Sequence, residues 1–149
     1  MKHRLLLLLA VVLFLAATFP LLAADFTIKE IRFETADGAE HTETVHVMLN
    51  TLLYPTIFAL VDGTPRVVCD FINAEPGPDI KRTIEINGQY IKRIRTGIHS
   101  NPKIKTRIVL DLVPDRDYKI QQIPSPKNNS FTLVVKVAAS TGNDQVRDK

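Results

Sequence analysis

Two short stretches of the chain carry an arginine and an aspartate at the same spacing among apolar residues. The stretch "PRVVCDF" begins at residue 65, and "TRIVLDL" begins forty-one residues later, at residue 106. Arg66 and Asp70 are therefore repeated as Arg107 and Asp111. Guanidinium groups bind carboxylates through paired hydrogen bonds, and two carboxyl groups at a suitable separation can hydrolyse a glycosidic bond. These residues indicate a framework of ion pairs, a binding surface or a hydrolytic site.

The spacing of the arginine and the aspartate excludes an ion pair within one strand. Residues four apart in a β-strand lie on one face but about 13 Å from each other, at about 3.3 Å per residue. If the two strands are antiparallel neighbours in the register that places Arg66 against Asp111, the same register places Asp70 against Arg107. The sequence therefore predicts this register and two cross-strand ion pairs. As exposed pairs they would contribute only about 0–1 kcal/mol each, chiefly by fixing the register.

The same polar face can also be interpreted as a binding surface. Residues 81–107 hold eight lysines and arginines and one acid, Glu85. Arg93 and Arg95 lie on one face of the strand before the second motif and would extend a basic surface. A charge run of this kind is also typical of a plain solvated face, so both interpretations of the segment stay open. The candidate ligand-binding residues are Arg66, Asp70, Arg93, Arg95, Arg107 and Asp111.

Signatures of catalysis are weak in this sequence. Beyond the first 24 residues the chain has three histidines and one cysteine, without the spacing of a zinc site. It also lacks the nucleophile elbow and the phosphate-binding loop. A glycosidase needs one protonated carboxyl group, whereas an arginine beside each aspartate would keep Asp70 and Asp111 ionised. The sequence therefore predicts a protein that is not an enzyme and that uses no cofactor or metal.

The elements that would position these residues are short strands. Alternating apolar and polar residues, punctuated by turn dipeptides, indicate about eight of them, and this arrangement is typical of an all-β sandwich. In the strand of the first motif, Cys69 and Phe71 would face the core. A two-residue turn at Asp62-Gly63 would put Phe58 on that same face. The predicted strands span residues 26–35, 44–50, 56–61, 66–71, 106–112, 118–123 and 131–137, with a further hairpin around Asn87-Gly88.

A second internal similarity indicates a duplicated architecture. The stretch "IKEIRF" from residue 28 resembles "IKRIRT" from residue 91, an offset of 63 rather than 41. The same offset aligns residues 45–49 with residues 108–112. It divides the chain near "AEPGPD" (74–79), where two prolines and a glycine would interrupt a strand. We therefore predict two pseudo-repeated halves of about four strands each, and interpret the 41-residue offset as convergence.

The ends of the chain differ in composition from the β-rich part. Residues 1–24 have a basic start and a long uncharged apolar run that ends in small residues, typical of a signal peptide or of an uncleaved anchor. Without them the chain has 17 lysines and arginines against 16 acids, so its net charge is near +1. We expect a single domain over residues 25–137 and a flexible polar tail over residues 138–149.

At several of these strands the chain resembles the AMIN domain, a small all-β module of exported N-acetylmuramoyl-L-alanine amidases and type IV pilus secretins. The matching pieces are "PRVVCDF" (65–71), "IKRIRTG" (91–97), "TRIVLDL" (106–112), "YKI" (118–120) and "FTLVVKV" (131–137). Cys69 departs from the family pattern, which has an aliphatic residue there. The resemblance implies a sandwich of two related β-sheets and a role in envelope localisation, often through peptidoglycan binding.

Together these observations predict a non-catalytic module that is exported to the periplasm or cell envelope and binds peptidoglycan or another anionic envelope polymer. The alternative is a protein-interaction subunit of an envelope protein complex such as a type IV pilus secretin. Export argues against nucleic acid as a partner, and a cleaved signal would leave no transmembrane segment.

Overall fold

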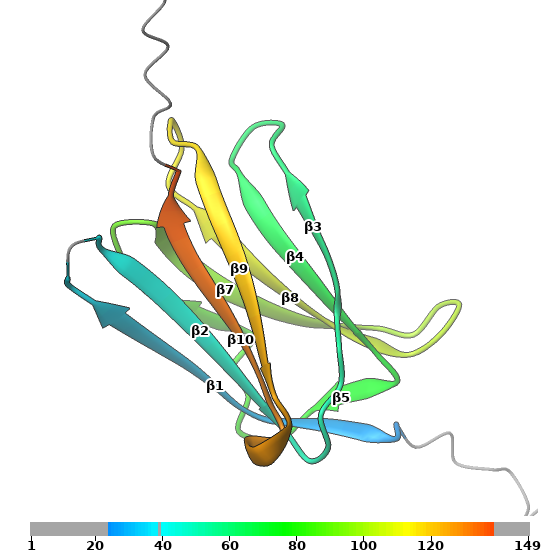
Figure 1. Ribbon diagram of the computed structural model, residues 1–149. Helices are drawn as coiled ribbons and strands as arrows, with labels where there is room; N and C mark the ends of the chain where they lie inside the picture. The colour runs from blue at the N-terminus through cyan, green and yellow to red at the C-terminus, as the bar shows by residue number, and fades with distance from the viewer. Residues whose placement is uncertain (1–23, 39, 139–149) are drawn as a thin grey trace, which may run out of the picture.

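Two five-stranded β-sheets pack face to face in the computed structural model, which describes residues 24–38 and 40–138 (Figure 1). Sheet A has the order β5-β1-β2-β10-β9, and sheet B has the order β3-β4-β8-β7-β6. The strands of sheet A are β1 (Phe26–Ala36), β2 (Thr42–Leu49), β5 (Ala74–Pro76), β9 (Tyr118–Ser125) and β10 (Ser130–Val137). Those of sheet B are β3 (Thr56–Leu60), β4 (Arg66–Ile72), β6 (Thr83–Glu85), β7 (Ile91–His99) and β8 (Lys105–Leu112). A single 3-10 turn, Pro126–Asn128, joins β9 to β10.

The predicted fold class, an all-β sandwich, is confirmed, with ten strands instead of about eight. The strand β5 forms inside the segment that the sequence marks as a break, and its three residues pair in parallel with the start of β1. Proline occurs in strands at sheet edges, and Pro76 lies in such an edge strand. No helix in the described part of the chain is long and apolar enough to cross a membrane. The expected signal peptide and tail lie outside the described residues, except for Ala24 and Ala138.

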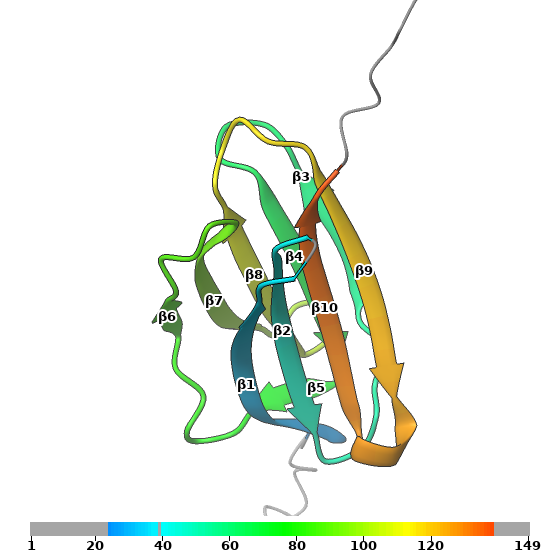
Figure 2. The ribbon, with the colours of Figure 1, turned by 60° about the vertical axis from the view of Figure 1, so that its left-hand side comes forward.

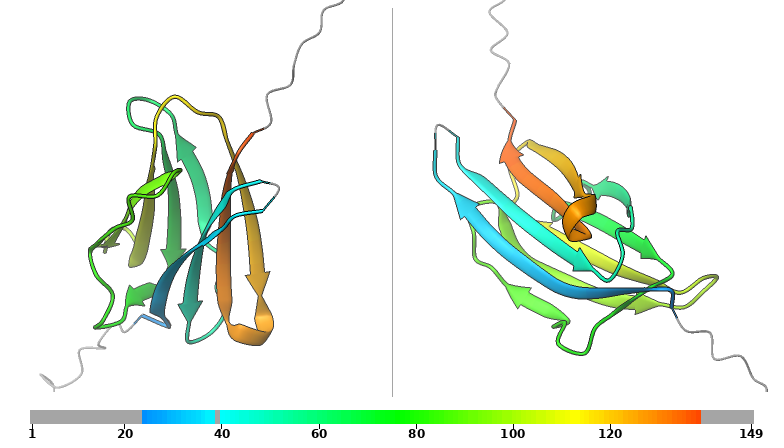
Figure 3. Two further views of the ribbon diagram at one scale, coloured as in Figure 1. Left: turned by 90° about the vertical axis from the view of Figure 1, so that its left-hand side faces the viewer. Right: turned by 60° about the horizontal axis from the view of Figure 1, so that its bottom comes forward.

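The two sheets repeat one arrangement, as the 63-residue offset predicts. In sheet A the β1–β2 hairpin pairs with β10, and in sheet B the β7–β8 hairpin pairs with β4. The pair Ile31 and Val47 recurs as Ile94 and Leu110. The first strand of each hairpin also carries its irregularity at the equivalent position. Each half of the chain therefore supplies one hairpin to each sheet: β1–β2 and β3–β4 from the first half, β7–β8 and β9–β10 from the second (Figures 1 and 3).

The core lies between the sheets and is built from the inward side of each strand. Cys69 and Phe71 are fully buried, as the sequence predicts, and the Phe71 ring packs edge-to-face on Phe131 with ring centroids 6.3 Å apart. Burial, aided by the charge of the neighbouring Asp70, raises the pKa of the Cys69 thiol to about 12. A buried thiol of this kind is inert, so Cys69 serves packing. Other large buried side chains are Ile28, Ile91, Ile94, Ile108, Leu110 and Leu133.

The turn between β3 and β4 differs from the sequence prediction. β3 ends at Leu60 and β4 begins at Arg66, so five residues connect the strands instead of two. Phe58 therefore pairs with Val68 and lies on the outer face of sheet B rather than in the core. A shift of one residue turns every side chain of a strand to the other face. The hairpin predicted around Asn87-Gly88 is present, and Figure 2 shows its short strand β6 at the margin of the sheet beside β7.

A buried carboxylate ties the two sheets together at the start of β7. Glu43 of β2 has no exposed surface, and its carboxylate accepts hydrogen bonds from the backbone N–H groups of Gln89, Tyr90 and Ile91 at 2.5–3.1 Å. A buried charge must be hydrogen-bonded to be tolerated, and these three donors meet that need. Gly88 completes the fit, because a Cβ atom at this position would lie 2.5 Å from Glu43 Oε1. The contact fixes where β7 begins, and so where its arginines project.

Candidate functional site

All six candidate residues lie on the outer face of sheet B. The predicted register is confirmed, because β4 and β8 are antiparallel neighbours with Arg66 opposite Asp111 and Asp70 opposite Arg107. β7 lies on the other side of β8. Three neighbouring strands therefore bring together residues from distant parts of the chain: Arg66 and Asp70 on β4, Arg93 and Arg95 on β7, and Arg107 and Asp111 on β8.

Asp70 forms the ion pair that the sequence predicts, together with one that it does not. Arg107 donates from Nε and Nη2 to the two carboxylate oxygens at 2.7 and 2.8 Å, and Lys105 Nζ donates at 2.7 Å. The carboxylate is only 8% exposed, so the expectation of an exposed pair was wrong. Hydrogen bonding from Arg107 outweighs burial and, with a smaller effect of Lys105, lowers the pKa of Asp70 to about 2. Asp70 therefore stays ionised and cannot act as a general acid.

Asp111 pairs with arginines of β7, and its predicted ion pair with Arg66 is absent from the described contacts. Arg95 donates from Nε and Nη2 to the two oxygens of Asp111 at 2.8 and 2.7 Å, and Arg93 Nε lies 3.1 Å from Oδ2. The prediction failed because Asp111 has a neighbouring strand on each side, and both arginines that contact it come from β7. Hydrogen bonding to Asp111 raises the pKa of Arg95, which keeps this guanidinium group charged.

Two arginines of this region, Arg66 and Arg82, have no carboxylate partner within the described residues. The Nε atom of Arg66 is buried and has no hydrogen-bond acceptor. Arg82 directly precedes β6, where its backbone carbonyl accepts a hydrogen bond of 2.8 Å from the N–H of Thr96. We call these two residues the uncompensated arginines. Positive groups without a partner attract anions, most strongly where they line a depression.

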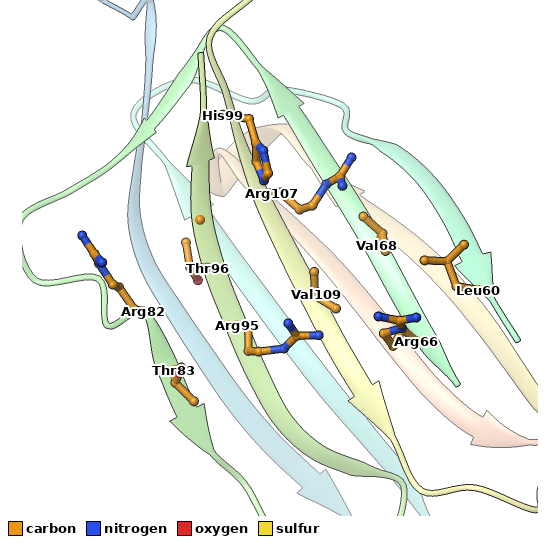
Figure 4. A pocket seen from close by; sticks show the side chains of 11 residues that line it. Leu60, Arg66, Val68, Arg82, Thr83, Arg95, Thr96, His99, Arg107 and Val109 are labelled. Atoms are coloured by element: carbon orange, nitrogen blue, oxygen red, sulfur yellow. The ribbon is translucent and has the colours of Figure 1, made fainter. Parts of the chain in front are cut away.

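The uncompensated arginines border a groove that crosses the strands of sheet B (Figure 4). The groove has a volume of about 420 Å³. Arg66 and Val68 lie on its β4 side and Arg82 on its β6 side, with Val109 and Arg95 between them (Figure 4). Gly97 leaves the surface open beside β8, since the nearest atom to a Cβ placed there would be 3.9 Å away. The groove therefore has an uncompensated arginine at each end and both apolar and hydrogen-bonding groups between them.

Arg95 and Arg107 also line the groove, and part of their hydrogen-bonding capacity is unused (Figure 4). A guanidinium group has five N–H donors, and the fork to an aspartate uses two of them. The other three remain on each arginine in a fixed orientation. Arg107 is held additionally by Phe58, whose ring centroid lies 5.6 Å from its Cζ atom. The two aspartates therefore position arginines, and the arginines are the groups available to a ligand.

The arrangement is suited to binding anions. Across residues 24–38 and 40–138, no group of three or more His, Cys, Asp or Glu side chains is placed to hold a metal ion.

The sequence does not identify Arg82, Gly97 or Phe58 as part of the site. The signal for Arg82 is its place in the basic segment 81–107, but the strand that follows it has only three residues. The sequence predicts Phe58 in the core because it predicts too short a turn before β4.

Comparison with known proteins agrees with this architecture. A family model described as the AMIN domain matches residues 30–135, which run from β1 into β10 and include every strand of sheet B. No curated protein matches the chain.

Proposed function

The chain belongs to the AMIN domain family, and on this basis we propose that it binds peptidoglycan through the groove of sheet B. The AMIN domain is a non-catalytic module of cell-envelope localisation. Two further parts of the proposal are export to the periplasm through residues 1–24 and retention of the protein at the cell wall by residues 25–137.

The observation that carries the proposal is the pair of uncompensated arginines at the ends of the groove. Peptidoglycan offers carboxylates from its peptides, and a guanidinium fork binds a carboxylate through two parallel hydrogen bonds. Asp70 is shared by Arg107 and Lys105, and Asp111 is shared by Arg95 and Arg93, so these clusters stay positive and Arg95 and Arg107 add oriented donors. Arg66 and Arg82, which have no carboxylate partner within the described residues, add further positive charge.

Cosedimentation with purified, protein-free cell walls tests the proposal. The wild-type protein should be retained, and retention should fall with salt because the attraction is electrostatic. Reversing charge with Arg66→Glu and Arg82→Glu should abolish retention. The matched control is Lys29→Glu with Lys119→Glu, two exposed lysines of sheet A, which should bind as the wild type does. Failure of the wild type to sediment with walls, or equal retention of the two double variants, would contradict the proposal.

A second candidate function is docking of a partner protein onto the edge of sheet B. β3 is an uncharged edge strand whose Phe58 and Leu60 are 37% and 40% exposed. An exposed edge of this kind can accept an additional strand from another protein. The edge strands β5 and β6 are only three residues long, and β9 carries Lys119 and Pro124, features that protect edges. Retention on protein-free walls distinguishes the candidates, because docking requires a protein partner and wall binding does not.

A further inference from the structure

We infer that the groove recognises a peptide stem of peptidoglycan by two of its carboxylates, one at each uncompensated arginine, rather than the sugar chain. This inference rests on the proposed function, because it specifies which part of the polymer the groove binds. Three features of the groove support it: the separation of its two cationic ends, the character of the surface between them, and the lack of a carboxylate partner for Arg66 within the described residues.

The two cationic ends lie on opposite sides of sheet B. Arg66 belongs to β4, and Arg82 directly precedes β6, which is three strands away in the order β4-β8-β7-β6. Neighbouring strands lie about 4.8 Å apart, and the register places Arg82 opposite Thr96, at the level of Cys69 and three residues from Arg66 along β4. The backbones that carry the two arginines are therefore about 17 Å apart. An extended peptide spans about 3.3–3.6 Å per residue, and about five residues therefore bridge this separation. A stem peptide has the required length.

The surface between the ends matches an uncharged peptide segment. Val68, Val109 and Gly97 provide an apolar surface that fits small side chains such as the methyl group of alanine. Arg95 and Arg107 are each paired with an aspartate but keep free N–H donors, which can bind the carbonyl oxygens of a peptide. Along the groove an uncompensated arginine is therefore followed by a hydrogen-bonding segment and then by the second uncompensated arginine. A stem built of alanine and dicarboxylic amino acids supplies both carboxylates for the arginines and carbonyl oxygens for the donors between them.

Arg66 is the anchor on the β4 side of the groove. Its Nε atom is buried and has no acceptor, so a ligand reaches this guanidinium group through its Nη atoms. Arg95 and Arg107 each use Nε and Nη2 to hold an aspartate side-on. A ligand carboxylate would instead bind Arg66 end-on, through two parallel N–H donors. The ligand would thus supply the carboxylate partner that Arg66 lacks within the described residues.

The sugar chain offers a poorer match than the peptide. In an intact wall the carboxyl groups of the muramyl units are joined to the stems by amide bonds, so the free carboxylates belong to the peptides. Hydroxyl and acetamido groups would leave both uncompensated arginines without a counter-charge. The lining of the groove also contains no Phe, Tyr or Trp that would offer a flat surface to a sugar ring.

Fluorescence anisotropy with labelled fragments tests the inference on the purified protein. The probes are a stem tetrapeptide, the same tetrapeptide with its carboxyl groups amidated, and glycan strands stripped of their peptides, with inorganic phosphate as a competitor. We expect binding of the free tetrapeptide, at least tenfold weaker binding of the amidated form, no binding of stripped strands, and little competition by phosphate. Arg66→Gln and Arg82→Gln should each weaken tetrapeptide binding about tenfold, and Arg32→Gln on sheet A should not.

The results of these binding experiments distinguish a failure of this inference from a failure of the proposed function. Retention on intact walls together with equal binding of stripped strands, or of the amidated peptide, would overturn the inference and leave the wall-binding proposal standing. Displacement of the tetrapeptide by low concentrations of phosphate would likewise overturn the assignment to carboxylates. A wild-type protein that binds neither intact walls nor any fragment would overturn both.

Discussion

The outer faces of the two sheets differ although their strands follow the same duplicated plan. On sheet B, Asp70 and Asp111 are buried, and each joins two strands through an arginine fork. On sheet A, Arg32 pairs with Glu30 at 2.9 Å along its own strand, and the two side chains are 54% and 44% exposed. One face therefore has a buried cross-strand network, and the other has an exposed ion pair within a single strand.

The positions of sheet A that are equivalent to Arg107 and Asp111 show whether strand pairing requires these charged residues. At an offset of 63, the counterparts of Arg107 and Asp111 on sheet A are Thr44 and Met48. Sheet A nevertheless keeps the same hairpin register and the same irregularity as sheet B. Strand pairing in this fold therefore does not depend on arginine and aspartate at these positions. The network of sheet B exceeds what pairing needs, which favours a role in positioning arginines for a ligand.

The largest loss of stability should come from removing the carboxylate of Asp70, which joins β4 to β8. In Asp70→Ala, Arg107 and Lys105 lose their common partner, and we expect the free energy of unfolding to fall by about 3 kcal/mol. Glu30→Ala on sheet A, the variant for comparison, breaks an exposed pair and should cost less than about 1 kcal/mol. Urea denaturation of both variants measures the difference. Similar losses in the two variants would mean that the faces do not differ in structural role.

Lowering the pH should also reveal how much the buried Asp70 carboxylate stabilises the fold. The pKa of Asp70 is about 2 in the folded protein, below the 3.8 that is usual for an aspartate, so its carboxylate stabilises the fold above about pH 4 and this contribution disappears as the pH falls through about 2. The difference corresponds to about 2 kcal/mol. Between these pH values the unfolding free energy of the wild type should decline by about that amount more than that of Asp70→Asn. Parallel pH profiles of the two proteins would disprove this origin.

Disturbing the contact between Glu43 and the turn before β7 should cause a smaller loss of stability. Glu43 holds the turn before β7, whereas its counterpart Thr106 donates a hydrogen bond of 2.7 Å to the carbonyl of Ala74. In Gly88→Ala the added methyl group would press on the Glu43 carboxylate, and we expect a loss of about 1–2 kcal/mol. Gly38→Ala, where no atom lies within 4 Å of the new Cβ, is the control. Thermal denaturation of both variants compares them, and equal stability would show that the carboxylate moves aside freely.

The smallest effect on stability should accompany a large effect on binding. Arg66 has no ion pair within the described residues and a buried Nε without an acceptor. Arg66→Gln should therefore change the free energy of unfolding by less than about 0.5 kcal/mol, yet weaken retention on purified walls. Denaturation and cosedimentation of one preparation give both values. A loss of stability as large as that of Asp70→Ala would make Arg66 a structural residue like the aspartates.

Much of the fold could be predicted because its signals are local. Alternation of apolar and polar residues located the strands, and the buried positions of Cys69 and Phe71 followed from it. The 63-residue offset identified the two halves, and even the register of β4 against β8 followed from the placement of opposite charges. β5 escaped prediction because its pairing with β1 is supplied by a distant part of the chain.

The sequence alone determined which residues alternate along each strand, which strands are repeated, and which face of β4 and β8 would carry charge. The sequence also predicted the pair of Asp70 with Arg107, but only the tertiary structure decided the partners of Asp111. Asp111 could bond to Arg66 on one side or to Arg95 on the other, and it bonds to Arg95 of β7. The physical reason is that β8 has a neighbouring strand on each side, and the sequence does not say which neighbour brings its guanidinium group to the carboxylate. Arg66 therefore has no carboxylate partner within the described residues, and the proposed binding function is argued from this residue.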